Sequence, residues 1–97
     1  MSFDIVLTAE AVEDVKALRG NLRAEVRDAI EMHLRHEPRK TSRSRIKRLR
    51  ELNRPQYRLR VGDIRVFYDV TDKTVEVLGI VAKSEADSWL IQFGNRE

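Results

Sequence analysis

The stretch Gln56–Val70, QYRLRVGDIRVFYDV, decides how the middle of this chain is expected to fold. Apolar and polar residues alternate on both sides of Gly62-Asp63, a pair suited to the positive φ angles of a two-residue turn. The pattern therefore predicts a β-hairpin. Because side chains alternate across a strand, one face of this hairpin should be apolar and cover a core. Its residues are Tyr57, Leu59, Val61, Ile64, Val66 and Tyr68.

The opposite face of the predicted hairpin carries Arg58, Arg60, Arg65 and Phe67. In this register Arg60 lies directly across from Arg65, and like charges so placed destabilise a sheet by up to about 1 kcal/mol. A guanidinium offers a planar fork of donors that matches phosphate oxygens, and an exposed aromatic ring can stack on an unpaired base. We therefore predict an anion site here. The alternative is a solvated sheet surface on which nearby carboxylates relieve part of the repulsion.

Towards the N-terminus, residues 3–7 (FDIVL) predict a strand at a sheet edge. Thr8 is placed to cap a helix over residues 8–19. A second helix is predicted from about Leu22 to His36, where apolar residues recur at every fourth position. The two helices are separated by almost no linker, so they should form an antiparallel αα-hairpin.

Beyond the hairpin, the apolar run VEVLGIVA at residues 75–82 predicts a central strand. Ser84 opens a capping box before a short helix over residues 84–93. Residues 46–52 are compatible with a strand or with a helical turn. The element order predicts an α+β fold, in which an N-terminal strand and an αα-hairpin pack on a small antiparallel β-sheet with a short C-terminal helix. Residues 1–97 are expected to form a single domain.

Positive charge is concentrated in the middle of the chain. Residues 39–65 contain eleven basic and two acidic residues, a net charge of +9, whereas residues 1–38 and 66–97 each carry a net charge of −3. Such asymmetry predicts contact with a polyanion or an acidic partner; a merely solvated surface is the alternative. Besides the hairpin, the candidates for phosphate contacts are Arg43, Arg45, Lys47, Arg48 and Arg50.

Several function classes are disfavoured. The chain has no cysteine, so disulfides and thiolate metal sites are excluded. Only His33 and His36 suggest metal binding, and two histidines are a weak signal, so neither a metal nor another cofactor is expected. There is no signal-peptide pattern and no apolar run approaching the roughly 18 residues that span a bilayer. A cytoplasmic location without membrane contact is therefore predicted. For proton transfer, Lys83 at the end of the last predicted strand is the best-placed candidate.

The stretch QYRLRVGDIRVFYDVTDKTVEVLGIVAKS, residues 56–84, resembles the RelE/ParE superfamily of toxins from bacterial type II toxin–antitoxin systems. The resemblance implies a RelE-like fold and a cognate antitoxin as partner. In the RelE branch, members cleave mRNA in the ribosomal A site without a metal, and their basic positions correspond to Arg58, Arg60 and Arg65, with Lys83 in the segment that supplies a further basic residue. Members of the ParE branch poison DNA gyrase.

One residue departs from the RelE pattern. Trp89 stands about where many RelE-type members have a catalytic Tyr or His. An indole can stack on a base but cannot usefully exchange a proton. Three interpretations follow. The first is a ribosome-dependent mRNA endoribonuclease in which the arginines hold the scissile phosphate, Lys83 assists, and Phe67 and Trp89 contact RNA. The second is a gyrase inhibitor, and the third is a weakly active member that mainly binds its antitoxin.

Overall fold

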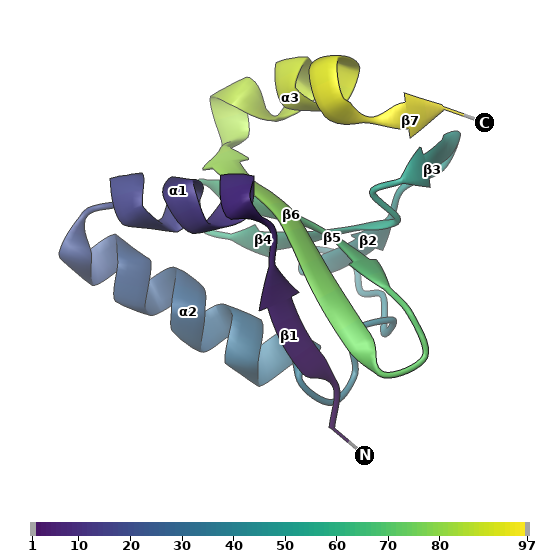
Figure 1. Cartoon of the computed structure of the whole chain (residues 1–97), viewed down its shortest axis with the longest axis horizontal. Helices are drawn as coiled ribbons and strands as arrows, with labels where there is room; N and C mark the ends of the chain where they lie inside the picture. The colour runs from purple at the N-terminus through teal and green to yellow at the C-terminus, as the bar shows by residue number, and fades with distance from the viewer. Residues whose placement is uncertain (1, 97) are drawn as a thin grey trace.

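A computed structural model describes residues 2–96, and its centre is a five-stranded mixed sheet with the strand order β1-β6-β5-β4-β2 (Figure 1). A second, two-stranded sheet pairs β3 with β7. The strands are β1 (Asp4–Leu7), β2 (Ile46–Arg48), β3 (Leu52–Arg54), β4 (Tyr57–Val61), β5 (Ile64–Val70), β6 (Thr74–Ala82) and β7 (Asn95–Arg96). The helices are α1 (Ala9–Ala17), α2 (Gly20–Leu34) and α3 (Ala86–Phe93), the last preceded by a 3-10 turn at Lys83–Glu85. The predicted α+β class is confirmed, and the predicted elements follow one another in the expected order, with the short strands β3 and β7 in addition.

The predicted hairpin is formed by β4 and β5, and its register is the predicted one throughout. Val61 pairs with Ile64 beside the turn, Arg60 pairs with Arg65, and Tyr57 pairs with Tyr68 at the open end. Gly62 has a φ of 57°, the left-handed conformation that the two-residue turn requires. All six residues of the predicted apolar face are buried. Local alternation was therefore sufficient to orient both strands.

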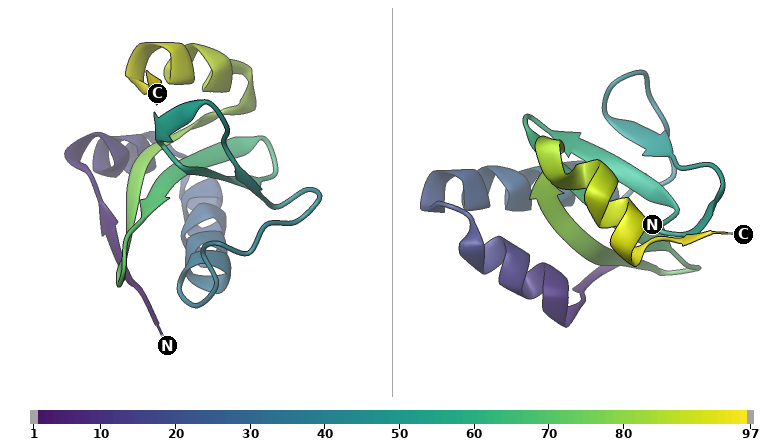
Figure 2. Two further views of the ribbon diagram at one scale, coloured as in Figure 1. Left: turned by 90° about the vertical axis from the view of Figure 1, so that its right-hand side faces the viewer. Right: turned by 90° about the horizontal axis from the view of Figure 1, so that it is seen from above.

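Helix α2 covers this apolar face with the predicted stripe, of which Val26, Ile30 and Leu34 are buried. In the first helix, the three-residue spacing of Val12, Val15 and Leu18 predicts one apolar side. In α1, however, Ala11 is the buried residue, whereas Val12 is 37% exposed. Helix α1 packs mainly against β6. Helix α3 lies over the opposite face of the sheet (Figure 2).

The first strand occupies an edge of the sheet, as predicted, but it runs parallel to β6, so the sheet is mixed and not wholly antiparallel. It pairs only with Thr74–Val77. Helix α1 follows immediately and covers the rest of the β6 edge. The Thr8 hydroxyl donates to the Leu78 carbonyl at 3.3 Å and accepts from the Ala11 amide at 3.1 Å. The Asp14 carboxylate accepts from the Ile80 amide at 2.9 Å.

Two further segments bear on the site. The ambiguous residues 46–52 form β2, a turn and the start of β3, because Ile46 is buried opposite Leu59. The capping box at Ser84 was wrong. Ser84 lies inside the 3-10 turn, and α3 begins two residues later without a side-chain cap. Between residues 2 and 96, no helix has the length and apolarity to cross a bilayer.

Candidate functional site

Four basic side chains gather on the sheet surface that faces away from α2. Residues opposite each other on antiparallel strands share a face, and Lys47 on β2 pairs with Arg58 on β4, while Arg60 pairs with Arg65 on β5. Arg45, also a predicted RNA-binding residue, does not join them: its carbonyl accepts from the Arg60 amide at 2.8 Å, but its side chain lines a hollow with Met32 and His33 of α2. We call this surface the basic face: Lys47, Arg58, Arg60 and Arg65.

No carboxylate within residues 2–96 forms an ion pair with the basic face. Asp69, the nearest acid on the same side of β5, is paired with Arg54 at 3.2 Å and accepts from the Gln56 amide. Burial raises the pKa of Asp69, and these two contacts partly offset that effect. The positive charge is therefore concentrated at one end of the sheet surface, whereas the carboxylates at the other end are already paired.

Arg58 has the least favourable surroundings of the four. It is half-buried, and its Nε has no hydrogen-bond partner in the part of the chain that the structure describes. Loss of solvation, followed by repulsion from Arg65 and Arg60, lowers the pKa of the Arg58 guanidinium. A buried donor without a partner costs about 1–3 kcal/mol. A bound anion would satisfy the donor and neutralise the repulsion.

Arg65 and Arg60 differ although they face each other across the hairpin. Arg65 is only 7% exposed, and its Nη1 donates to the carbonyls of Gly62 at 2.8 Å and of Ile64 at 3.0 Å. Its guanidinium thus anchors the turn. Arg60 is exposed. In the basic face, Arg65 is therefore a fixed cation, Arg58 is a desolvated one, and Arg60 can extend into solvent.

The prediction of an exposed Phe67 was wrong. The residue lies on the predicted face, but it is 0% exposed because Trp89 of α3 stacks on it, with ring centroids 4.8 Å apart. Opposite Phe67 on β6 is Gly79, where a β-carbon would collide with the indole. The absence of a side chain at Gly79 is what admits Trp89. The ring of Phe67 is therefore not available to stack on a base. Trp89, which also contacts Phe93, keeps part of its indole exposed.

The other basic residues of the middle segment are dispersed. Arg48 pairs with Tyr57 and so belongs to the opposite side of the sheet, where its guanidinium lies 5.3 Å from the Tyr57 ring centre and its Nη1 donates to the Leu49 and Gln56 carbonyls. Arg43 and Arg50 are exposed on the loops before and after β2.

Lys83 lies next to the hairpin turn, but in a separate hollow. Its backbone amide donates to the Asp63 carbonyl at 2.7 Å. The hollow, of about 520 Å³, is lined by Asp63, Lys83, Ser84 and Asp87, and by no arginine of the basic face. The two tyrosines are on the core side, where Tyr68 donates to the Pro38 carbonyl at 2.7 Å and burial raises its pKa. Neither tyrosine can therefore serve the basic face.

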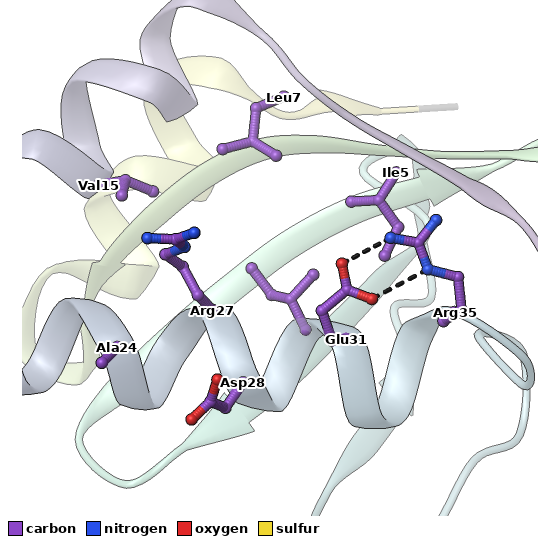
Figure 3. A pocket seen from close by; sticks show the side chains of 9 residues that line it. Ile5, Leu7, Val15, Ala24, Arg27, Asp28, Glu31 and Arg35 are labelled. Carbon is purple, nitrogen blue, oxygen red and sulfur yellow. Dashed lines mark hydrogen bonds and ion pairs between the residues drawn. The ribbon is translucent and has the colours of Figure 1, made fainter.

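A further hollow, of about 520 Å³, lies between α2 and the strand β1 (Figure 3). Its apolar lining includes Ile5, Leu7 and Ile30, and a Glu31–Arg35 ion pair, with Arg35 Nε 2.9 Å from the carboxylate, stands at its rim. None of the predicted site residues contributes to it. The apolar stripe of α2 and the edge position of β1 were the sequence signals for this hollow. Among the described residues, no group of three or more His, Cys, Asp or Glu is placed to hold a metal ion.

Comparison with solved structures finds the same fold in several chains. A chain of the RelBE2 toxin–antitoxin complex from Mycobacterium tuberculosis superposes with a TM-score of 0.71 at 24% identity, covering 84% of this chain and 99% of that one. A chain of the RelE–RelB complex from Pyrococcus horikoshii gives 0.63 at 25% identity, covering 86% and 97%. A RelE mutant from E. coli in the free state gives 0.57 at 16% identity, covering 92% of each chain.

The search of curated proteins returns no match. The family model of the ParE toxin of the type II toxin–antitoxin system parDE, in contrast, matches residues 5–86. This range includes both strands of the hairpin and every residue of the basic face. Because this match spans well over half of the chain, the protein belongs to the ParE toxin family of type II toxin–antitoxin systems, within the RelE/ParE superfamily.

Proposed function

We propose that this toxin is a ribosome-dependent endoribonuclease that cleaves mRNA and thereby blocks translation, with the basic face as its phosphate site. The observation that supports the proposal best is the Arg58 guanidinium, a half-buried cation with a hydrogen-bond donor that has no partner within residues 2–96 and with two further arginines beside it. A fold keeps such a costly arrangement when an anion relieves it.

In the proposed reaction, the RNA supplies its own nucleophile. The 2′-oxygen of one nucleotide forms a bond to the adjacent phosphorus while the bond to the 5′-oxygen of the next nucleotide breaks. The proton leaves the 2′-oxygen, and another is delivered to the departing 5′-oxygen. The products are a 2′,3′-cyclic phosphate and a free 5′-hydroxyl. Arg58 and Arg60 would hold the phosphate oxygens and stabilise the negative charge that develops in the transition state.

In this proposal Lys83 carries out the proton transfers. Lys83 begins the 3-10 turn that follows β6, and its backbone amide donates to the Asp63 carbonyl of the hairpin turn at 2.7 Å, so its hollow adjoins the end of the hairpin that carries Arg60 and Arg65. Trp89 cannot act as an acid or base. We therefore expect charge stabilisation by the arginines to account for most of the rate enhancement and proton transfer for a smaller part.

The test is an in vitro translation reaction in which mRNA 5′ ends are mapped by primer extension, with and without ribosomes. New ends that appear only with ribosomes are expected for the wild-type protein, and Arg60→Ala should remove them. Arg60 is the residue of choice because its side chain is exposed and anchors nothing. Arg27→Ala, which removes an exposed arginine from α2, is the matched control and should cleave normally. Wild-type cleavage that Arg60→Ala retains in full would refute the proposal.

A second function, inhibition of DNA gyrase, is favoured by one specific observation. Within residues 2–96, the basic face contains no side chain that exchanges protons near neutral pH, since Tyr57 and Tyr68 are buried on the other side and Trp89 is stacked on Phe67. A surface of that kind can bind a polyanion without cleaving it. Gyrase supercoiling assayed with a molar excess of the toxin separates the two functions: inhibition without mRNA cleavage would establish this one.

We also propose an antitoxin partner that covers the basic face and the loop before β2. The chains similar to this one include members of solved RelB–RelE complexes. The net charge of +9 between residues 39 and 65 favours an acidic antitoxin segment that becomes ordered on binding. Complex formation should then weaken as the salt concentration rises, which a titration of the toxin with its antitoxin would measure.

A further inference from the structure

A groove between α1 and α3 lies outside the surfaces described so far. Its volume is about 550 Å³, and its apolar lining comes from Val81 on β6 and from Trp89 and Phe93 on α3. A smaller hollow of about 230 Å³ shares Trp89 and Phe93 with it and adds Leu78. Both helices stand at the same end of the sheet, with β6 between them (Figures 1 and 2).

Helix α3 presents two large apolar side chains, Trp89 and Phe93, to this groove. Phe93 is 53% exposed and Trp89 is half-buried, and both line the groove, whereas the exposed Ile91 of the same helix does not. Trp89 is docked on the sheet through its stack on Phe67. Exposed apolar side chains that gather at a concave surface are typical of a protein-binding site, whereas isolated ones are ordinary. The apolar part of the groove can therefore receive an apolar side chain of a partner.

The charge around this groove is opposite to that of the basic face. Its lining includes Glu10, Glu13, Asp14 and Glu85, and no lysine or arginine. One oxygen of Asp14 accepts from the Ile80 amide, and Glu13 has only an exposed contact with Lys16 at 3.4 Å. In the smaller hollow the single cation, Arg54, is engaged by Asp69 and Glu76 at 3.2 and 2.8 Å. The carboxylates of the rim thus remain available to an incoming cation.

We propose that the α1–α3 groove docks a cationic protein segment that inserts an apolar side chain between Trp89 and Val81 and pairs its lysines or arginines with Glu10, Glu13 and Glu85. A polyanion or an acidic segment is repelled by the same rim. The occupant is therefore chemically distinct from the ligand of the basic face, and this proposal holds whether the toxin cleaves RNA or inhibits gyrase. An amphipathic helix suits a groove walled by two helices, since its apolar stripe can face the lining while its charges face the rim.

Trp89 provides the reporter, because it is the only tryptophan of the chain and lines the groove. The probe is a dye-labelled Lys/Leu peptide of about 12 residues, roughly three helical turns, without aromatic residues. At about 50 mM salt, its addition to the intact protein should raise the peptide's fluorescence anisotropy and shift the Trp89 emission. A second peptide with glutamine in place of lysine should bind at least about tenfold more weakly, since it cannot pair with the rim.

Matched variants locate the site. The double variant Glu10→Gln/Glu13→Gln should bind the Lys/Leu peptide about three- to tenfold more weakly. Glu25→Gln/Asp28→Asn removes the same charge from exposed positions on α2 and should bind as the wild-type protein does. Phe93→Ala should weaken binding of the peptide without changing how that binding depends on salt concentration, because the substitution removes apolar contact only. Equal weakening by both double variants, or binding without a Trp89 shift, would overturn the proposal, as would the absence of binding to the wild-type protein. Circular dichroism establishes that each variant is folded.

Discussion

Arg58 and Arg65 carry the same charge on the same side of the hairpin, but their guanidinium groups have different environments. Arg65 donates to two carbonyls of its own turn, and Arg58 has a buried Nε without a partner among the described residues. Hydrogen bonds offset the desolvation of a buried cation only where they are formed. At the residue scale, Arg65 therefore stabilises the hairpin. Arg58 lowers the stability of the fold, because its desolvation is not offset by hydrogen bonds.

We accordingly expect opposite effects on the free energy of unfolding from two substitutions. Arg65→Ala should lower it by about 1–3 kcal/mol, because the turn loses its anchor. Arg58→Met should raise it by roughly 1 kcal/mol, because a desolvated cation and its repulsion disappear while the apolar stem is kept. Urea unfolding followed by circular dichroism measures both, with Arg27→Met as an exposed control. A loss of stability in Arg58→Met would mean that the free protein already satisfies this guanidinium.

A second prediction concerns the stacked aromatic pair. In Gly79→Ala the new β-carbon would lie against the Trp89 indole at less than contact distance. Overpacking of this kind costs about 1–3 kcal/mol, and we also expect the Trp89 emission to shift because the ring must leave Phe67. Gly20→Ala is the matched control, since nothing lies within 4 Å of its added β-carbon. Unchanged emission and stability in Gly79→Ala would show that α3 is not held by this stack.

At the scale of elements, two segments satisfy the backbone groups along one edge of β6. The strand β1 does so for the N-terminal part of β6, and side chains of α1 and its cap do so for the C-terminal part. β1 ends at Leu7, opposite Val77, and the β6 edge beyond it would otherwise present open backbone groups. Side chains of Thr8 and Asp14 bind those groups instead. An edge capped in this way cannot accept an additional strand, so partners at this end of the molecule must use side-chain contacts.

Removal of one of these contacts should open the edge locally. Asp14→Ala is expected to lower the free energy of unfolding by about 1–2 kcal/mol, since the Ile80 amide loses its acceptor. Hydrogen exchange should locate the change, with faster exchange at the Ile80 amide than elsewhere on β6. Glu13→Ala, one residue earlier on the exposed side of α1, should leave this amide protected. If the Ile80 amide exchanges equally slowly in both variants, the carboxylate is not its acceptor in solution.

At the scale of the whole molecule, the charge segregation along the chain becomes a segregation in space. The basic middle segment supplies β2, β4 and the loop before them, and the acidic first segment supplies α1. The two surfaces are separated by α3, which lines the acidic groove with Phe93 and approaches the basic side of the sheet with Trp89. One small chain thus offers oppositely charged sites to different partners.

Binding of single-stranded RNA to the basic face should depend steeply on salt. Each phosphate contact to single-stranded RNA contributes about −0.7 to the slope of log K against log salt concentration. Arg60→Ala should therefore reduce the magnitude of the slope by roughly 0.7, and Arg27→Ala should leave it unchanged. Fluorescence anisotropy of a labelled RNA between about 50 and 200 mM salt measures the slopes. Equal slopes for Arg60→Ala and the wild-type protein would place the RNA elsewhere.

The features that the sequence alone determined are those specified by local periodicity. The alternation from Tyr57 to Tyr68 set the hairpin register and the faces of its side chains. The apolar residues at every fourth position from Val26 to Leu34 set the buried side of α2. Thr8 caps α1, as predicted. These signals hold because a period of two or of about four residues leaves few ways to bury the apolar side chains.

Only the tertiary structure decided what covers each face. Phe67 is buried because Trp89, from a helix that begins nineteen residues later, docks over Gly79, and no local pattern around Phe67 records that contact. The direction of β1, the place of Lys83 in a separate hollow and the groove between α1 and α3 likewise depend on elements that are distant in sequence. Local periodicity tells which side chains share a surface, but whether that surface meets solvent depends on long-range packing.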